Sequence, residues 1–84
     1  MSTKVLHNVR VVDANEDLEY VVLDAGKQDG VRVGMVFHVM DGDEVVATLR
    51  AADVRDDLTG STVEEVVASN RYPRPSDRVI LGQN

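Results

Sequence analysis

The side chains best suited to acid and base catalysis are two histidines, His7 and His38. Histidine is the residue type that most readily gains or loses a proton near neutral pH. His38 lies between Phe37 and Val39, in a run typical of a β-strand, and His7 alternates with valines. We therefore interpret both as part of the wall or rim of a sheet. A zinc site would need three or four ligands, and the chain has no cysteine to supply them.

Paired carboxylates are the next candidates for chemistry, and they occur at 41–43, 56–57 and 64–65. Asp41-Gly42-Asp43 resembles the start of a calcium loop, but Val45-Val46 follows where further oxygen ligands would be needed. A hairpin turn with Gly42 at its tip fits better. Adjacent residues on a strand point to opposite faces, so Glu64 and Glu65 cannot work as one acid and base pair.

The chain lacks the common motifs for phosphate binding and nucleophilic catalysis. The chain has no Gly-x-Gly-x-x-Gly, no Walker-type lysine and no Gly-x-Ser-x-Gly elbow. The sequence therefore predicts a protein that is not an enzyme and that uses no cofactor.

Composition limits the partners. The 84 residues suffice for one domain, 1–84, and carry a formal net charge of −6. Nucleic acids and anionic membrane surfaces attract basic proteins, so both are disfavoured as partners. Charged residues make up 29% of the chain, which predicts no membrane insertion. The N-terminus has no apolar signal-peptide core. We expect a cytoplasmic location, or the cell envelope if the domain comes from a longer exported protein.

The fold class follows from the apolar residues, of which seventeen are valine. Valine fits a pleated sheet and is a mediocre helix former. Alternation and turn residues predict strands at 5–12, bending near residues 12–13, and at 18–25, 35–40, 44–54 and 77–81. Within 44–54, one face should carry Val45, Ala47, Leu49 and Ala51. With one more strand, this predicts an all-β fold, a small barrel of about six short, mainly antiparallel strands.

Residues 61–70 fit two structures. Ser61 and Glu64 match a helix capping box, and Val63, Val66 and Val67 have helical spacing. Valine content and the alternation of Val63, Glu65 and Val67 favour a strand, which we predict. The following residues, 69–76, contain two prolines and should be irregular.

One segment resembles a known family. Glycines and an Asp-Gly turn separate two apolar strands, in the order Val21-Val22-Leu23-Asp24-Ala25-Gly26, Asp29-Gly30-Val31 and Gly34-Met35-x-Phe37-x-Val39. The pattern resembles small bacterial β-barrel domains: the β-domain of rod-shape-determining (MreC-like) envelope scaffolds and the C-terminal domain of the flagellar assembly protein FlgT. The resemblance covers residues 9–81. It implies turn roles for Gly26, Asp29, Gly30 and Gly34, and a core position for Val31. That family has Gly-Asp before its last strand, where this chain has Ser76-Asp77.

The segment Arg71-Tyr72-Pro73-Arg74-Pro75 is the best candidate for recognition, because arginine and tyrosine are enriched in interfaces. We expect it to be exposed and to be an ordinary connecting loop; the alternative is contact with a partner through Arg71, Tyr72 and Arg74.

The function we expect is a non-enzymatic protein-interaction or assembly module of a bacterial structure. The alternative is a small-ligand-binding or regulatory barrel with His7 and His38 at its mouth. We also expect a weak or moderate homodimer formed along the edge of the strand at 44–54.

Overall fold

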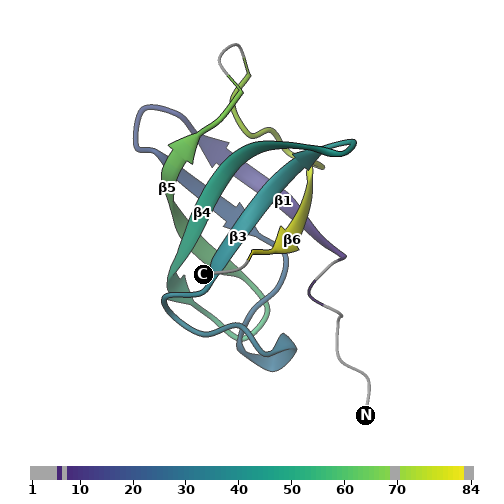
Figure 1. Ribbon diagram of the computed structural model, residues 1–84. Coiled ribbons are helices and arrows are strands. Elements are labelled where there is room, and N and C mark those ends of the chain that lie inside the picture. Colours follow the sequence, from purple (N-terminus) through teal and green to yellow (C-terminus); the bar gives the residue numbers. More distant parts are fainter. Residues whose placement is uncertain (1–5, 7, 69–70, 83–84) are drawn as a thin grey trace.

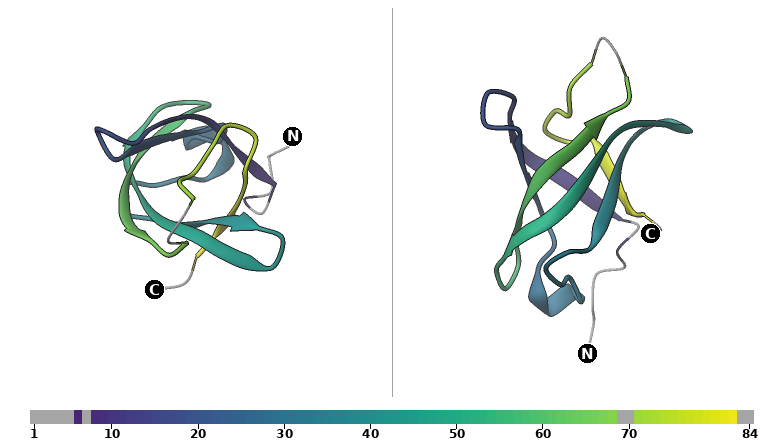
Figure 2. Two further views of the ribbon diagram at one scale, coloured as in Figure 1. Left: turned by 90° about the horizontal axis from the view of Figure 1, so that it is seen from above. Right: turned by 60° about the vertical axis from the view of Figure 1, so that its left-hand side comes forward.

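A computed structural model describes residues 6, 8–68 and 71–82 of the chain. It contains one short 3-10 helix, η1 (Lys27–Asp29), and six β-strands, which are β1 (Val9–Asn15), β2 (Tyr20–Leu23), β3 (Val36–Asp41), β4 (Glu44–Val54), β5 (Thr59–Val66) and β6 (Arg78–Leu81). The strands form one closed barrel in the order β1-β2-β5-β4-β3-β6, and every neighbouring pair is antiparallel (Figure 1). The predicted all-β barrel is confirmed. Seen from above, the strands ring a central space (Figure 2).

Side chains on the inner faces of the strands fill that space. In β1, Val9 and Val11 are buried and Arg10 is exposed, as alternation requires. The buried apolar core is Val9, Val11, Val21, Leu23, Ala25, Val31, Phe37, Val39, Val46, Ala47, Leu49, Ala51 and Val79. Val31, between η1 and β3, belongs to this core although it lies outside any strand. The interior is thus closed by a connecting segment as well as by strands.

The alternation predicted for residues 44–54 is wrong at one position. The pairing of β3 with β4 shifts between Val39 and Met40, where Val45 lies opposite Met40 and Ala47 lies opposite Val39. The extra residue, Val46, is buried, while Val45 is only half-buried. A bulge of this kind places two consecutive side chains, Val46 and Ala47, in the core.

Residues 59–66 form strand β5, so the strand that we favoured over a helix is correct as far as Val66. Residues 69 and 70 lie outside the described residues. The strand begins earlier than expected because Thr59 and Ser61 point inward and are satisfied there. Their hydroxyls donate 2.7 Å hydrogen bonds to the carbonyl oxygens of Ala25 and Val21. Hydroxyl-bearing residues can therefore occupy core positions of this barrel.

The first strand starts at Val9, later than predicted, and Val5 and His7 lie outside the described residues. The bend expected near residues 12–13 coincides with a shift of register between Val11 and Asp13. The hairpin from β3 to β4 turns at Gly42, whose φ is 61°. A positive φ at the first central residue is characteristic of a type II′ turn, in which glycine is favoured.

The predicted dimer edge on residues 44–54 is wrong, because β4 is paired with β3 on one side and with β5 on the other. Closure of the barrel takes up the backbone groups that a second copy would have needed. In the described part of the chain, no helix has the length and apolar character needed to cross a bilayer.

Candidate functional site

The glycine-rich middle of the segment that carries the family resemblance, residues 26–34, lies at one end of the barrel, at the bottom of Figure 1. Gly26 has an extended backbone, with φ −147°. A side chain there would collide with the carbonyl oxygen of Arg55 and the backbone of Asp56. The same turn accepts hydrogen bonds from the amides of Lys27 (2.7 Å) and Gln28 (3.0 Å). Glycine at position 26 therefore allows two connections to pack backbone against backbone.

The other residues of this segment shape the chain around η1. The Asp29 carboxylate accepts a hydrogen bond from the amide of Gly26 at 2.9 Å. Gly30 and Gly34 have φ values of 96° and 93°, in the left-handed region that glycine adopts without strain. These residues bend the chain back to β3 and place Val31 in the core.

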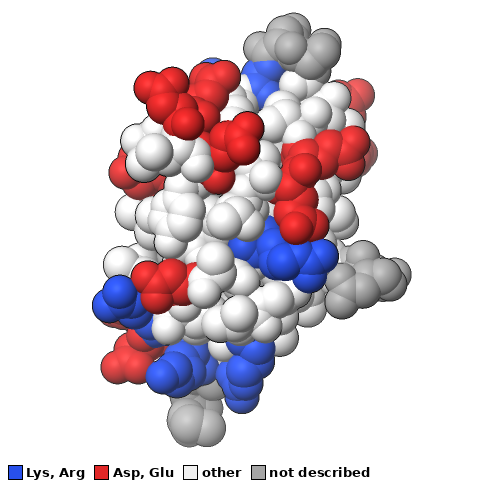
Figure 3. All heavy atoms as spheres, turned by 90° about the vertical axis from the view of Figure 1, so that its left-hand side faces the viewer, with Lys and Arg blue, Asp and Glu red and all other residues white. Residues whose placement is uncertain are grey.

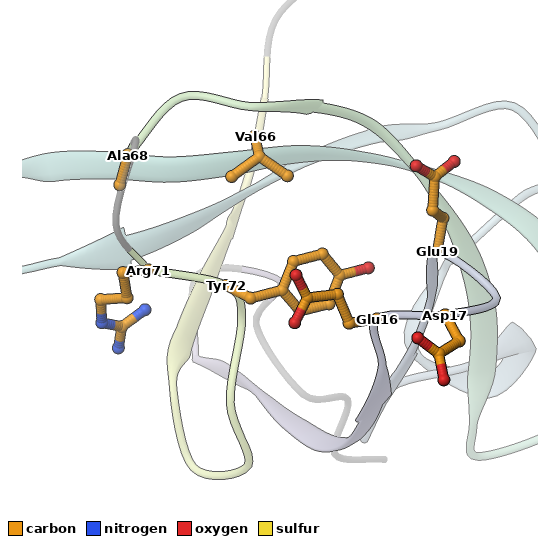
Figure 4. Close-up of a pocket in the computed structure, with 7 residues that line it drawn as sticks. All are labelled: Glu16, Asp17, Glu19, Val66, Ala68, Arg71 and Tyr72. Carbon is orange, nitrogen blue, oxygen red and sulfur yellow. The ribbon is translucent and has the colours of Figure 1, made fainter.

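The opposite end of the barrel holds a hollow of about 650 Å³. We call it the acidic hollow; its lining residues are Glu16, Asp17, Glu19, Val66, Ala68, Arg71 and Tyr72. They come from the β1–β2 hairpin, the end of β5 and the connection to β6, and Figure 4 shows where each of them lies. Two parts of the chain that are far apart in sequence, the β1–β2 hairpin and the end of β5 with the connection that follows it, therefore form one surface.

The hairpin wall of the acidic hollow is held by local hydrogen bonds. The amide of Leu18 donates to the side chain of Asn15 at 3.1 Å, and the amide of Glu19 donates to the carbonyl of Glu16, also at 3.1 Å. The carbonyl of Glu19 in turn accepts the amide of Val63 at 3.0 Å. The carboxylates are thus displayed by a turn that is tied to β5.

Arg71 was expected to be exposed, and this is wrong. Its side chain is only 16% exposed, and its Nη2 donates to Asp77 Oδ1 at 2.6 Å while its Nε lies 3.6 Å from Asp41 Oδ2. The hydrogen bond to Asp77 is the main cause that raises the pKa of Arg71, and the charges of Asp77 and Asp41 raise it further against the effect of burial. Arg71 therefore anchors the loop, and its charge is already compensated by partners outside the acidic hollow.

The other residues of the candidate recognition segment, 72–75, differ in their exposure. Tyr72 lines the acidic hollow, Pro73 is buried, and only Arg74 and Pro75 are exposed. Arg74 is not a lining residue, and its amide donates to Asp77 Oδ2 at 2.8 Å. Asp77 thus receives hydrogen bonds from two positions of the loop and fixes its course.

Tyr72 reports the electrostatics of the acidic hollow. Burial is the first cause that raises the pKa of Tyr72 above its ordinary value of 10.0, and the negative charges of Glu19 and Glu16 raise it further. Among the described residues, its hydroxyl oxygen is a buried atom without a hydrogen-bond partner. The phenol is therefore half-buried near two negative charges, and its hydroxyl is an unused polar group.

Acidic and basic side chains are distributed unevenly between the two ends of the barrel. Figure 3 shows most acidic side chains toward the end that carries the β1–β2 hairpin, and most basic ones toward the middle and the opposite end. Leu18, at the tip of that hairpin, is 72% exposed, and Val66 and Val67 are exposed as well. The acidic end thus combines negative charge with uncovered apolar surface. Within the described ranges, no group of three or more histidine or carboxylate side chains is arranged to hold a metal ion.

His38 does not contribute to this site. It lies on β3, half-buried, with its Nδ1 3.3 Å from Thr48 Oγ1 on the neighbouring strand. His38 does not line the acidic hollow and His7 lies outside the described residues, so the ligand mouth expected from these two histidines stays a prediction.

Glu16, Asp17 and Glu19 were not predicted as site residues, and Glu19 lies in the strand predicted at 18–25, whereas β2 begins at Tyr20. The available signal was the accumulation of three carboxylates around Leu18 in a loop between apolar strands.

Comparison with models of protein families, with curated proteins and with solved structures gives no match to this chain.

Proposed function

We propose that this barrel is a non-enzymatic protein-interaction module of a bacterial assembly, and that it docks a basic, partly apolar segment of its partner in the acidic hollow. The observation that carries the proposal is the convergence of Glu16, Asp17 and Glu19 with exposed apolar side chains around one concave surface. Opposite charge in a partner would steer its approach and fix its orientation. The apolar rim would supply contact area that charge alone does not.

Charge compensation supports this partner chemistry. The arginine in the lining, Arg71, is already paired with Asp77, so it does not neutralise the hairpin carboxylates. A lysine or arginine of a partner could approach these carboxylates, and the face of the Tyr72 ring offers a further favourable contact for a cation. The resemblance of residues 9–81 to envelope and flagellar assembly domains agrees with an assembly role.

The absence of an enzymatic role is part of the proposal. The closest approach to a nucleophile and base among the described residues is Thr48 with His38, at 3.3 Å. Neither residue lines the acidic hollow, and an acyl-transfer site would also need an oriented base and a place for substrate.

The test is binding of short peptides measured by fluorescence anisotropy. A peptide alternating lysine with leucine should bind more tightly than the same peptide with glutamate in place of lysine. Glu16→Gln combined with Glu19→Gln should weaken binding about tenfold, while Glu44→Gln, an exposed carboxylate at the start of β4, should have little effect. Equal loss from Glu44→Gln, or no preference for the basic peptide, would refute this docking surface.

A second candidate is the binding of a small cationic ligand. Its support is the size of the acidic hollow, since pockets for small molecules span about 300–1,000 Å³. Such a ligand would raise the melting temperature in a panel of metabolites and would compete with the basic peptide. A panel that leaves the melting temperature unchanged would exclude this candidate.

A further inference from the structure

A second hollow lies at the end of the barrel opposite the acidic hollow. Its volume is about 520 Å³, and it is lined by Lys27, Val31, Arg32, Val33 and Val54. Val33 is 70% exposed, and Leu58, in the β4–β5 turn at the same end, is exposed as well. We call this surface the basic end. It joins positive charge to uncovered apolar side chains, as the acidic end joins negative charge to them.

Carboxylates also occur near the basic end, and two of them have defined partners. Asp53 forms a salt bridge of 3.0 Å with Arg55, and the hydrogen bond with Arg55 is the main cause that lowers the pKa of Asp53. Asp29 accepts the amide of Gly26. Asp56 and Asp57 do not line this hollow, but they are exposed in the turn that carries Leu58 and therefore reduce the positive charge of this end. In the part of the chain that the structure describes, neither Lys27 nor Arg32 forms an ion pair, so both cations are available to a partner.

The acidic hollow and the basic end lie at opposite ends of the barrel (Figure 2, right), so these two surfaces cannot contact each other within one molecule. They can contact each other when a second copy is stacked end to end on the first. We propose that the acidic hollow of one copy receives the basic end of another, with Lys27 and Arg32 facing Glu16, Asp17 and Glu19. The apolar side chains Val33 and Leu58 would then meet Leu18 and Val66. This inference rests on the proposed function and names the partner as a second copy of the chain.

The contact joins different surfaces, so it leaves one end of each copy free and can repeat along an axis. The two shorter extents of the molecule are 26 and 24 Å, so the area buried on each partner is below the ~800 Å² of a standard stable interface. The net charge of −6 also opposes association, although salt screens it beyond about 8 Å at physiological ionic strength. We expect a weak, concentration-dependent assembly.

Sedimentation velocity of the full chain over a concentration series tests this arrangement. Glu16→Lys disables the acidic end and Arg32→Glu disables the basic end, and each should weaken self-association about tenfold or more. Arg78→Glu is the matched control, because Arg78 is an exposed arginine on β6 and the change in charge is the same as in Arg32→Glu.

A mixture of the Glu16→Lys and Arg32→Glu chains provides the sharpest result. Each chain keeps one intact end, so the mixture should recover the one-to-one association that neither variant shows alone. A wild-type chain that stays monomeric at every concentration, or equal loss from Arg78→Glu and Arg32→Glu, would overturn the inference.

The Arg32→Glu chain separates this inference from the proposed function. It keeps the acidic hollow and should still bind the lysine and leucine peptide. If it binds the peptide while the wild-type chain does not self-associate, the end-to-end contact is refuted and the docking surface stands. If the mixture recovers the association and the peptide does not bind, the second copy is the occupant and docking of other basic segments is refuted.

Discussion

The hydroxyl of Thr59 donates a 2.7 Å hydrogen bond to the carbonyl oxygen of Ala25 in the interior of the barrel. The bond joins the start of β5 to the residue before Gly26, at the end where β2 gives way to η1. Ser61 makes an equivalent bond to Val21 two residues further along β5. Two buried hydroxyls therefore fasten β5 to the segment that runs beside it.

Thr59→Val tests the first of these bonds. Valine has almost the same shape as threonine but leaves the carbonyl of Ala25 without this donor, so we expect a loss of about 1–3 kcal/mol in the free energy of unfolding. The control is Thr62→Val on the same strand, where the side chain is exposed and the cost should be smaller. Urea unfolding measures both, and equal effects would show that the buried bond contributes nothing specific.

Ser76→Gly should stabilise the fold. Ser76 has a φ of 77°, in the left-handed region where a side chain costs about 1–2 kcal/mol, and its amide is held there by a 2.8 Å hydrogen bond to Val11. Glycine removes that cost but loses about 0.5–1 kcal/mol through its freer unfolded chain. A net gain of up to about 1.5 kcal/mol should appear in thermal unfolding. Ser76→Ala keeps the unfavourable conformation and should bring no gain.

Gly26→Ala should destabilise the fold by about 1–3 kcal/mol, because the added methyl group meets the backbone of Arg55 and Asp56, which cannot rotate away. Gly60→Ala is the comparison. There the methyl group meets the ring of Tyr20, the far end of a half-exposed side chain that can swing outward. Gly26→Ala should therefore have the lower unfolding midpoint. The reverse order would contradict the tight packing at Gly26.

Val46→Ala should cost about 1–3 kcal/mol, because Val46 is fully buried at the bulge in β4. Val45→Ala removes the same two methyl groups from a half-buried position and should cost less. Guanidinium unfolding of the two variants compares them directly. A larger loss from Val45→Ala would indicate that the strand has the simple alternating register and no bulge.

Deprotonation of Tyr72 should lower the free energy of unfolding of the barrel at alkaline pH. The folded state holds the phenol proton more tightly than the unfolded chain, because burial and the charges of Glu19 and Glu16 raise the pKa of Tyr72 above 10.0. The contribution of this group to stability is present below pH about 10 and is lost as the pH rises through the folded-state pKa.

The measurement uses a Tyr20→Phe chain, in which Tyr72 is the remaining one of the two tyrosines. Ultraviolet absorbance of the phenolate should give a titration midpoint above 10.0, and Glu19→Gln should lower it. Glu44→Gln should leave the midpoint unchanged. A midpoint at or below 10.0, while circular dichroism shows the folded barrel, would contradict the burial of this ring.

The alternation of residues and the turn residues were sufficient to predict the strands of the β3–β4 hairpin. The strand Glu44–Val54 has the predicted bounds, because turn residues and alternation both lie within one hairpin. The strand at Thr59–Val66 was predicted against a helix from its valines. Its start at Thr59 was not predicted. Thr59 and Ser61 face inward, where their hydroxyls donate to carbonyls of another segment, and the sequence does not show that these acceptors lie within reach.

Other features depend on the exact register of the strands and on tertiary contacts, which the alternation of residues does not reveal. The bulge that buries Val46 arises from the register between β3 and β4. Arg71 holds the loop before β6 in place because the fold brings Asp77 and Asp41 close to its guanidinium group. Of the residues proposed for partner contact, Arg71 and Tyr72 line the acidic hollow and Arg74 does not, and the carboxylates of the hairpin were not anticipated at all.

The pairing of β1 with β6 sets the order in which the protein can be completed. Val9 lies opposite Val79, 70 positions along the chain, so the ring cannot close on a ribosome until the last strand has emerged. Until then β1 and β3 each present an unpaired backbone, which in a nascent chain is a template for aggregation. The hairpin of β3 and β4, by contrast, can form from adjacent residues. A translation pause before residue 78 would therefore prolong the interval in which this small barrel is most vulnerable.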